Sequence, residues 1–347
     1  MLRWWKDADW CYRIGSMAGI ALLAAAFVYG RLALARAEGP VRLQVYAFST
    51  QEEVLTQEIF PAFEKAWEEE TGRELTIEGV FGASGTLAGQ INLGAPADVA
   101  LLSNAHHVTY LRVGRRVRDD TEAVAVGETP MVIVVRPGNP KGIATYADLA
   151  RPGVQVLHAD PASSGAGQWA VLAEYGSALL ETGDRAAAEA QLKAIWGNVH
   201  LLGASARSMM TLFELGAGDA FVTYEQDARR AQERGVPLEI VVPSPTIVAQ
   251  HVALVVDDNV TLVERPVARA LVAYLQSEAA QQTLARYHLR PAGDGQEGFA
   301  PLGAAFTVEE LGGWPAAYAG VIEKVWAAQI EPELDLEPIS GPLRVEE

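Results

Sequence analysis

Cysteine and positive charge are both scarce in this chain. Of its 347 residues only Cys11 is a cysteine, so an internal disulfide or a metal site built from several thiolates is excluded. Lysine and arginine number 27 against 44 aspartates and glutamates, which gives a net charge of −17 at pH 7. Because a nucleic-acid partner requires a basic surface to neutralise its phosphates, this balance argues against one.

Familiar catalytic motifs are also missing. The six histidines form no H-E-x-x-H pair, and the adjacent His106 and His107 would point to different sides of a helix, which favours surface or packing roles. Ser84 and Ser164 are each followed directly by glycine and do not form a G-x-S-x-G elbow. We therefore expect no enzyme activity, no cofactor and no metal. A serine hydrolase is the distant alternative.

One strongly apolar, uncharged run, Ile14 to Gly30, stands near the N-terminus. Arg3, Lys6 and Arg13 precede it, and Ala35-Arg36-Ala37 follows it. A charged start, an apolar centre and a small-x-small end are typical of an export signal. A run of this length is near the lower limit of about 17 residues for a membrane-spanning helix. Residues 1–37 are thus predicted to be a cleaved signal peptide or an uncleaved membrane anchor, with a buried core helix as a third alternative.

Two short segments rich in serine and glycine lie where a strand pattern runs into a helix pattern. One is Pro161 to Trp169, between the strand pattern of Val154 to Leu157 and an amphipathic helix. The other is Phe81 to Thr86, between a strand at Leu75 to Val80 and the helical run Leu87 to Leu93. Such turns leave backbone N–H groups and the positive end of a helix dipole open to an anion. The pair suggests a jaw that closes on an oxyanion.

Strand and helix patterns alternate along the rest of the chain. This alternation predicts an α/β protein with mostly parallel sheets and helices on both faces, and ligands in such folds bind beyond the carboxyl ends of the strands. The further expected strands are Val41–Phe48, Val99–Leu102, Met131–Val135, Val199–Leu202 and Ala220–Tyr224; the further expected helices are Ala186–Trp196, Met209–Leu215 and Pro315–Gln329.

The helix expected after the first strand has marked end signals. Ser49 and Thr50 are each followed three residues later by a glutamate, which predicts a capping box at its start. Pro61 is expected to kink or split this helix, and Thr71-Gly72 to end it. At the other end of the chain, residues 331–347 are acidic and spaced by prolines, which predicts a loose tail.

Taken in order, several segments give the chain a resemblance to a known family. It resembles the periplasmic sulfate/thiosulfate-binding proteins of ABC transporters, which have the type 2 periplasmic-binding-protein fold, from about residue 41 to 314. That resemblance implies two α/β lobes, 41–126 plus 247–291 and 127–246, joined by two crossing strands with the ligand cleft between them, and a C-terminal extension, 292–347. The segments are Gly82-Ala83-Ser84-Gly85, Val135 to Lys141, Ser163-Ser164-Gly165 with Trp169, Ser205-Ala206-Arg207, and Phe306 to Glu310 with Gly312-Gly313-Trp314.

The resemblance also implies which residues hold the ligand. Ser84 and Ser164 are expected to donate from the hydroxyl and the backbone N–H. Gly165, Ala166 and Ala206 are expected to donate backbone N–H groups. Ala166 stands where the family has a second glycine, which leaves an N–H donor unchanged.

Two positions depart from the sulfate-binding pattern. Tyr224 falls where the family has an indole donor, and Ser49 falls where it has an aspartate. Both substitutions resemble the related molybdate/tungstate-binding proteins, as does Gly94 to Asp98. The Ser-Ser-Gly segment with its tryptophan and the segment from Phe306 to Trp314 favour sulfate.

The function implied is capture of a tetrahedral oxyanion, sulfate or thiosulfate first, for delivery to an ABC transporter permease. Molybdate or tungstate is the alternative. We expect a monomer, in the periplasm or at the outer face of the cytoplasmic membrane. Simpler roles stay open for three residues: Ser164 as a helix cap, Tyr224 as part of the core, and Arg207 as a brace for a loop in place of a contact with the anion.

Overall fold

A mixed β-sheet runs through both halves of the molecule. The structure is a computed structural model, and it describes residues 39–293 and 297–336. The strand order is β2-β1-β3-β9-β4-β7-β5-β6, with β10 beside β9 and β8 beside β4. The strands are β1 (Val41–Phe48), β2 (Leu75–Gly82), β3 (Val99–Leu102), β4 (Val124–Val135), β5 (Val156–Ala159), β6 (Val199–Gly203), β7 (Ala220–Tyr224), β8 (Glu239–Val241), β9 (Thr246–Val255) and β10 (Ala305–Phe306).

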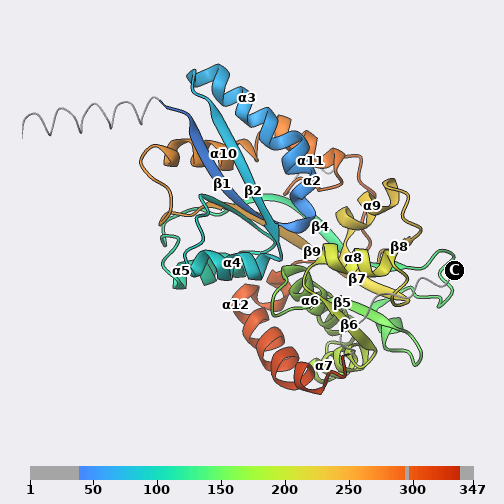
Figure 1. The fold of residues 1–347 in the computed structure, drawn as a ribbon. Helices are drawn as coiled ribbons and strands as arrows, with labels where there is room; N and C mark the ends of the chain where they lie inside the picture. The colour runs from blue at the N-terminus through green and yellow to red at the C-terminus, as the bar shows by residue number, and fades with distance from the viewer. Residues whose placement is uncertain (1–38, 294–296, 337–347) are drawn as a thin grey trace, which may run out of the picture.

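The two ends of this sheet are parallel and its centre is antiparallel. Pairs β1–β2, β1–β3, β5–β6 and β5–β7 are parallel, which confirms the predicted parallel pairing for the outer strands. Pairs β3–β9, β9–β4 and β4–β7 are antiparallel, because β4 and β9 run in opposite directions through the middle. We call β1–β3 with their helices the first lobe and β5–β8 with theirs the second lobe (Figure 1).

β4 and β9 are the strands that pass between the lobes. β4 pairs with β9 as far as Pro130 and then with β7 from Met131 onward, so one continuous strand belongs to both lobes. A third segment runs beside them, since Glu128 and Arg290 exchange backbone hydrogen bonds of 2.7 and 2.9 Å. Three stretches of chain therefore connect the lobes.

Helices cover both faces of each lobe, as the alternating pattern predicts. In the first lobe, α3 and α10 pack on one face and α4 and α5 on the other. In the second lobe, α6 lies against the crossing strands, and α8 and α9 lie against β7. The principal helices are α3 (Phe60–Thr71), α4 (Ser84–Asn92), α5 (Ala105–Val113), α6 (Gly165–Thr182), α7 (Arg185–Trp196), α8 (Ala206–Glu214), α9 (Glu225–Glu233), α10 (Glu264–Tyr274) and α11 (Glu278–Arg286).

The helical run after β1 differs from the expected one at its start. It begins as a 3₁₀ turn, Ser49–Gln51, and no side chain caps it, so the predicted capping box is wrong. The two glutamates form ion pairs with arginines of the second lobe instead: Glu53 contacts Arg230, and Glu52 lies 3.9 Å from Arg207. The predicted kink or split at Pro61 takes a milder form: the backbone stays helical through Ile59 and Phe60, and a π-helical turn passes directly into α3. The predicted end at Gly72 is confirmed, since its φ of 68° is left-handed.

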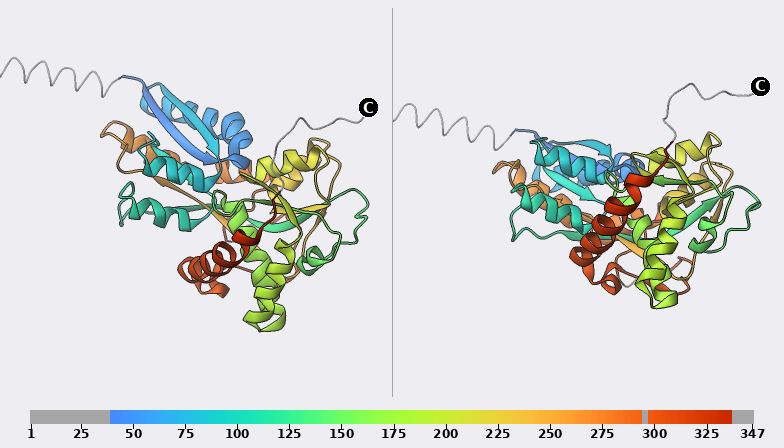
Figure 2. Two further views of the ribbon diagram at one scale, coloured as in Figure 1. Left: turned by 60° about the horizontal axis from the view of Figure 1, so that its bottom comes forward. Right: turned by 90° about the horizontal axis from the view of Figure 1, so that it is seen from below.

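The C-terminal extension folds back over both lobes. The expected helix is present as α12 (Gly313–Ala317) and the π-helical η5 (Tyr318–Ile330), which cross the lower surface in Figure 2. Trp314 packs on Trp169 of α6 with 4.7 Å between the ring centroids, and Tyr318 stacks on His106 of α5 with 3.6 Å between the ring centroids. The extension thereby bridges the second lobe and the first.

The predictions for residues 1–37, and for most of the acidic tail, lie outside the described residues. Within residues 39–293 and 297–336, no helix combines the length and the apolar composition needed to cross a membrane.

Candidate functional site

A small pocket opens where the carboxyl ends of strands from both lobes meet. The space between its walls, part of which is open to solvent, is about 190 Å³. All seven ligand-binding residues predicted from the sequence line it. The lining is Phe48, Ser49, Thr50, Gly82, Ala83, Ser84, Ser103, Ser164, Gly165, Ala166, Ser205, Ala206 and Tyr224, and none of these carries a formal charge.

Three helices begin at this pocket. α4 starts at Ser84, α6 at Gly165 and α8 at Ala206. Each N-terminus presents backbone N–H groups that have no partner within its helix, together with the positive end of a dipole. The three converge on one small volume because parallel strands deliver their helices to the same edge of the sheet. The pocket therefore suits an anion without any cationic side chain.

Ser164 occupies the N-cap position of α6 but does not cap it. Its backbone is extended, and its side chain makes no hydrogen bond to the helix. The simple capping role is thus absent, and the buried hydroxyl is free to face a ligand. Ser205 at the start of α8 behaves differently, since its hydroxyl accepts the N–H of Ser208 at 3.2 Å. The Ser205 hydroxyl also donates its proton to the Ser208 hydroxyl at 3.3 Å, so of the two only the Ser164 hydroxyl is available as a donor to the pocket.

The Ser84 hydroxyl is held by groups that the sequence analysis did not select. It accepts the backbone N–H of Ser103 at 3.0 Å, and it lies 2.9 Å from Nδ1 of His107. Burial lowers the pKa of His107 to about 3, so the imidazole is neutral at physiological pH. Ser103 follows β3 just as Ser84 follows β2, and that repeated strand-to-helix pattern is the signal by which it could have been found.

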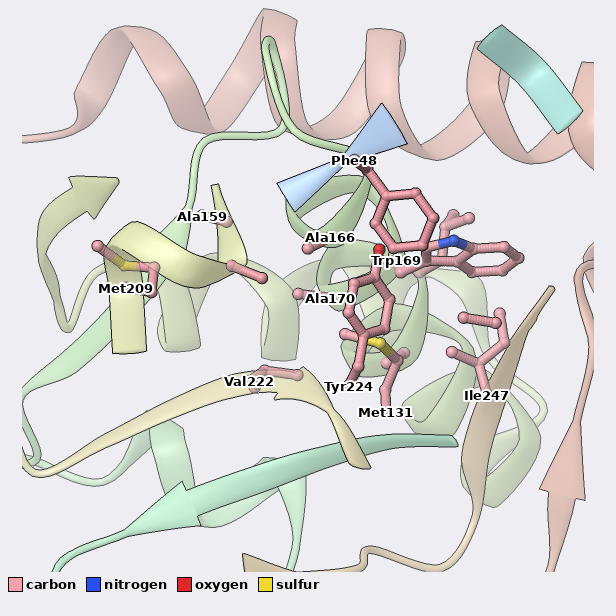
Figure 3. Close-up of a cluster of buried hydrophobic side chains, with 14 of the residues drawn as sticks. Phe48, Met131, Ala159, Ala166, Trp169, Ala170, Met209, Val222, Tyr224 and Ile247 are labelled. Carbon is pink, nitrogen blue, oxygen red and sulfur yellow. The ribbon is translucent and has the colours of Figure 1, made fainter. Parts of the chain in front are cut away.

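Tyr224 ends β7 with its side chain fully buried and its hydroxyl turned toward Phe48 and Trp169 (Figure 3). Neither this hydroxyl nor that of Ser103 makes a hydrogen bond of good geometry to a described residue, although the two lie close enough for Ser103 to act against the rise in the pKa of the phenol. Burial raises the pKa of the Tyr224 phenol above its usual range, so the proton stays in place as a donor. Because an unpaired buried hydroxyl is costly, a ligand oxygen in this pocket would satisfy it.

Arg207 braces the pocket from outside. Its Nε and Nη2 donate to the carbonyl oxygen of Ser49 at 3.1 and 3.0 Å, and the residue does not line the pocket. Of the two roles considered for it, these contacts favour the brace. The guanidinium fixes the turn that presents the N-terminal end of the first helical run, and it does so across the two lobes.

The structure is closed around the pocket. Thr86 N–H donates to the carbonyl oxygen of Ser163 at 3.1 Å, which ties together the two turns rich in serine and glycine. A side-chain hydrogen bond of 2.9 Å, from Asn104 to Gln168, also joins the lobes and is buried. Among the described residues, no cluster of three or more acidic, histidine or cysteine side chains is arranged to hold a metal ion.

Comparison with known proteins shows the family to which the chain belongs. Residues 43–290 match the bacterial extracellular solute-binding protein family. The chain belongs to this family. This solute-binding protein is 35% identical over 283 residues to the sulfate-binding protein of Escherichia coli K12, which covers 76% of this chain and 85% of that one. It is 33% identical over 245 residues to the thiosulfate-binding protein of Pseudomonas aeruginosa, covering 68% and 74% of the two chains.

A solved structure agrees with these sequence relatives. The sulfate-binding protein SubI from Mycobacterium tuberculosis H37Rv superposes on this solute-binding protein with a TM-score of 0.74 at 26% identity, covering 80% of this chain and 98% of SubI. The periplasmic thiamin binding protein shares the fold, with a TM-score of 0.60 at 17% identity. The expected fold is confirmed: two α/β lobes of the type 2 periplasmic-binding-protein class with a cleft at the crossing strands.

Proposed function

We propose that this protein captures sulfate outside the cytoplasmic membrane and delivers it to the permease of an ABC transporter. The observation that carries the proposal is the pocket itself: three helix N-termini and several hydroxyl groups meet there with no charged side chain in the lining. Sulfate and thiosulfate are the ligands named for the curated relatives. A fully deprotonated dianion needs donors alone, and donors are what these residues offer.

The residue roles follow from the positions in the pocket. Ser84 and Ser164 donate hydroxyl protons, and Tyr224 donates its phenolic proton in place of an indole N–H. Backbone N–H groups of Ser49, Gly165, Ala166 and Ala206 complete the set, because each lies at the start of a helical segment. Arg207 supports the set through the Ser49 carbonyl.

Selectivity against phosphate is the sharpest consequence. Near neutral pH phosphate keeps a proton, and the lining offers that proton no carboxylate acceptor. One unpaired buried polar group costs about 1–3 kcal/mol, or roughly ten- to a hundredfold in affinity. Calorimetric titration with sulfate, thiosulfate, molybdate, tungstate and phosphate at pH 7 tests this. Equal binding of phosphate and sulfate would contradict the proposal.

Molybdate or tungstate is the second candidate, and one observation favours it. Tyr224 and Ser49 both depart from the sulfate-type residues in the direction of the molybdate-binding proteins. The same titration separates the two: a larger affinity for molybdate than for sulfate would reassign the ligand and leave the oxyanion mechanism intact.

A hydrolytic function receives little support from the contact between the Ser84 hydroxyl and His107. His107 lies within hydrogen-bond distance of Ser84, but a pKa of about 3 makes it a weak base at neutral pH. No carboxylate hydrogen-bonds its other ring nitrogen among the described residues, so the third member of a triad is missing there. Turnover of a chromogenic ester, abolished by Ser164→Ala, would revive the hydrolase alternative.

The proposed site of action rests on the N-terminal sequence and on the family. Residues 1–37 are proposed to direct export, either as a cleaved signal or as an anchor, and the exported protein is proposed to act as a monomer. The lobes are proposed to comprise 41–126 plus 247–291 and 127–246, and to rotate about the crossing strands during closure. Intact-mass measurement after expression in an exporting bacterium distinguishes the two forms. A full-length protein confined to the cytosol would contradict both.

A further inference from the structure

The hydroxyl of Ser84 already has two protein neighbours before any ligand arrives. Its oxygen accepts the Ser103 N–H at 3.0 Å and lies 2.9 Å from Nδ1 of His107. A serine hydroxyl has one proton and two lone pairs. Because the Ser103 N–H takes one lone pair, the protonation of His107 decides whether the hydroxyl proton remains for a ligand.

The two neutral tautomers of His107 give opposite results. With the proton on Nδ1, the imidazole donates to Ser84, whose own proton is then free to point into the pocket. With the proton on Nε2, the Ser84 hydroxyl donates its proton to Nδ1, and only a lone pair is left to face the ligand. The first arrangement suits an anion without protons, and the second suits an anion that carries one.

The surroundings of His107 favour the first tautomer. The side chain is buried, and its backbone N–H donates to the Asn104 side chain at 3.1 Å, which anchors the first turn of α5 beside Ser84. Nε2 makes no hydrogen bond to any described residue, so a proton placed there would have no acceptor within the described protein. A proton on Nδ1 is satisfied by the Ser84 oxygen.

We propose that His107 is a positioning residue: it holds the Ser84 hydroxyl as a donor toward the anion and so favours fully deprotonated ligands. This inference rests on the proposed oxyanion function and adds a selectivity element to it. His107 does not touch the ligand pocket itself; it acts through Ser84.

The first test reads the tautomer directly in the wild-type full chain. Protein labelled with ¹⁵N-histidine is saturated with sulfate, and the His107 signals are assigned by their loss in His107→Leu. We expect a protonated Nδ1 and an unprotonated Nε2. A proton on Nε2 in the sulfate complex would overturn the inference. If calorimetry shows no sulfate binding, the proposed function fails instead, and the two failures are thus distinct.

The second test is a double-mutant cycle on sulfate affinity. His107→Leu is expected to weaken binding about tenfold, because Ser84 loses its fixed orientation. In the Ser84→Ala background the same replacement should cost less than twofold. An equal loss in both backgrounds would mean a merely structural role and would overturn the inference.

Two further variants sharpen the cycle. His107→Asn can place an amide N–H where Nδ1–H stood, so it should restore most of the affinity lost in His107→Leu. His106→Leu is the matched control: His106 precedes His107 on α5, its ring stacks on Tyr318 with 3.6 Å between ring centroids, and it makes no hydrogen bond to Ser84. The effect of His106→Leu on sulfate affinity should be the same in the wild-type and the Ser84→Ala backgrounds. Failure of the asparagine variant to bind better than the leucine variant would count against the inference.

Discussion

Arg290 and Glu225 form an ion pair that is almost wholly withdrawn from solvent. Nη2 and Nε of Arg290 lie 2.8 and 3.2 Å from the same carboxylate oxygen, and the two side chains are 2% and 5% exposed. Glu225 directly follows Tyr224, and Arg290 lies in the third segment that passes between the lobes. The pair therefore fixes the end of β7 to the connection between the lobes.

Removing one partner of this ion pair should lower the stability of the folded protein. Arg290→Met leaves the Glu225 carboxylate buried with only the partial support of Arg229 at 3.2 Å, so we expect a loss of about 3 kcal/mol in the free energy of unfolding. The double variant Arg290→Met with Glu225→Leu should recover much of this. Lys65→Met in the exposed Lys65–Glu69 pair is the control, with an expected change of about 0.5 kcal/mol or less. Urea denaturation measures all three, and a loss below about 1 kcal/mol for Arg290→Met would contradict the argument.

A methyl group at Gly165 should block closure. The added Cβ would overlap the Ser103 hydroxyl oxygen across the pocket and would approach Nδ2 of Asn104 to 3.0 Å. Because both neighbours belong to the first lobe, we expect Gly165→Ala to weaken anion binding at least tenfold while the anion-free protein keeps its melting temperature. Gly89→Ala is the matched control, since a Cβ there meets no atom within 4 Å. Calorimetry and thermal unfolding together check this, and unchanged affinity in Gly165→Ala would show that the overlap is relieved cheaply.

The phenol of Tyr224 should separate binding from stability. Tyr224→Phe deletes one charge-assisted donor, so we expect sulfate affinity to fall by about 1.5–3 kcal/mol. The anion-free protein should be nearly as stable as before, because the lost hydroxyl makes no well-formed hydrogen bond to a described residue. Tyr224→Trp should recover sulfate binding through its indole N–H, whereas molybdate binding should stay weak. If Tyr224→Phe changes the affinity for every anion by less than twofold, the residue belongs to the core and its assignment as a ligand donor is wrong.

Asp227 should make stability depend on pH. Burial raises its pKa to about 6, against the lowering effect of Arg207 and Arg234, and Glu214 adds to the rise. The folded protein therefore holds a proton that the unfolded chain has released, and stability falls as the pH rises from about 4 to 6. Asp227→Asn should add about 1–3 kcal/mol at pH 7.5 and almost nothing at pH 4. Denaturation of both proteins across this range measures the effect; the same gain at both pH values would rule out titration of Asp227 as its cause.

The parts of the fold that were predictable are those set by local pattern. β3 and β7 match their predicted bounds, and Gly72 ends its helix as expected, because a short run of mostly apolar residues and a left-handed glycine are signals contained within a few residues. The antiparallel centre was not predictable in the same way. β4 and β9 are far apart in the sequence, and nothing local records that they pair.

The candidate site was likewise predictable only where short local patterns determine it. The turns that contain Ser84 and Ser164 were predicted to face an anion because strand-to-helix turns leave N–H groups free, and the resemblance to the family supplied the roles of the two serines. His107 was predicted to have a surface or packing role, since a histidine in a helix pattern carries no sign of the serine that it contacts 23 residues away. The predicted capping box at Ser49 failed for a related reason: the glutamates that suit a local cap are engaged by arginines of the other lobe.

The pairing of β3 with β9 has a consequence for biosynthesis. It joins Val99 to Val255, so the first lobe cannot complete its sheet until the whole second lobe has been translated. The strands β5 to β8, in contrast, lie within residues 156–241 and can associate as soon as they emerge. Pairings between distant segments also form slowly, because loop closure precedes any gain from contact. The lobe that is synthesised first is therefore the one whose strand pairing is completed last.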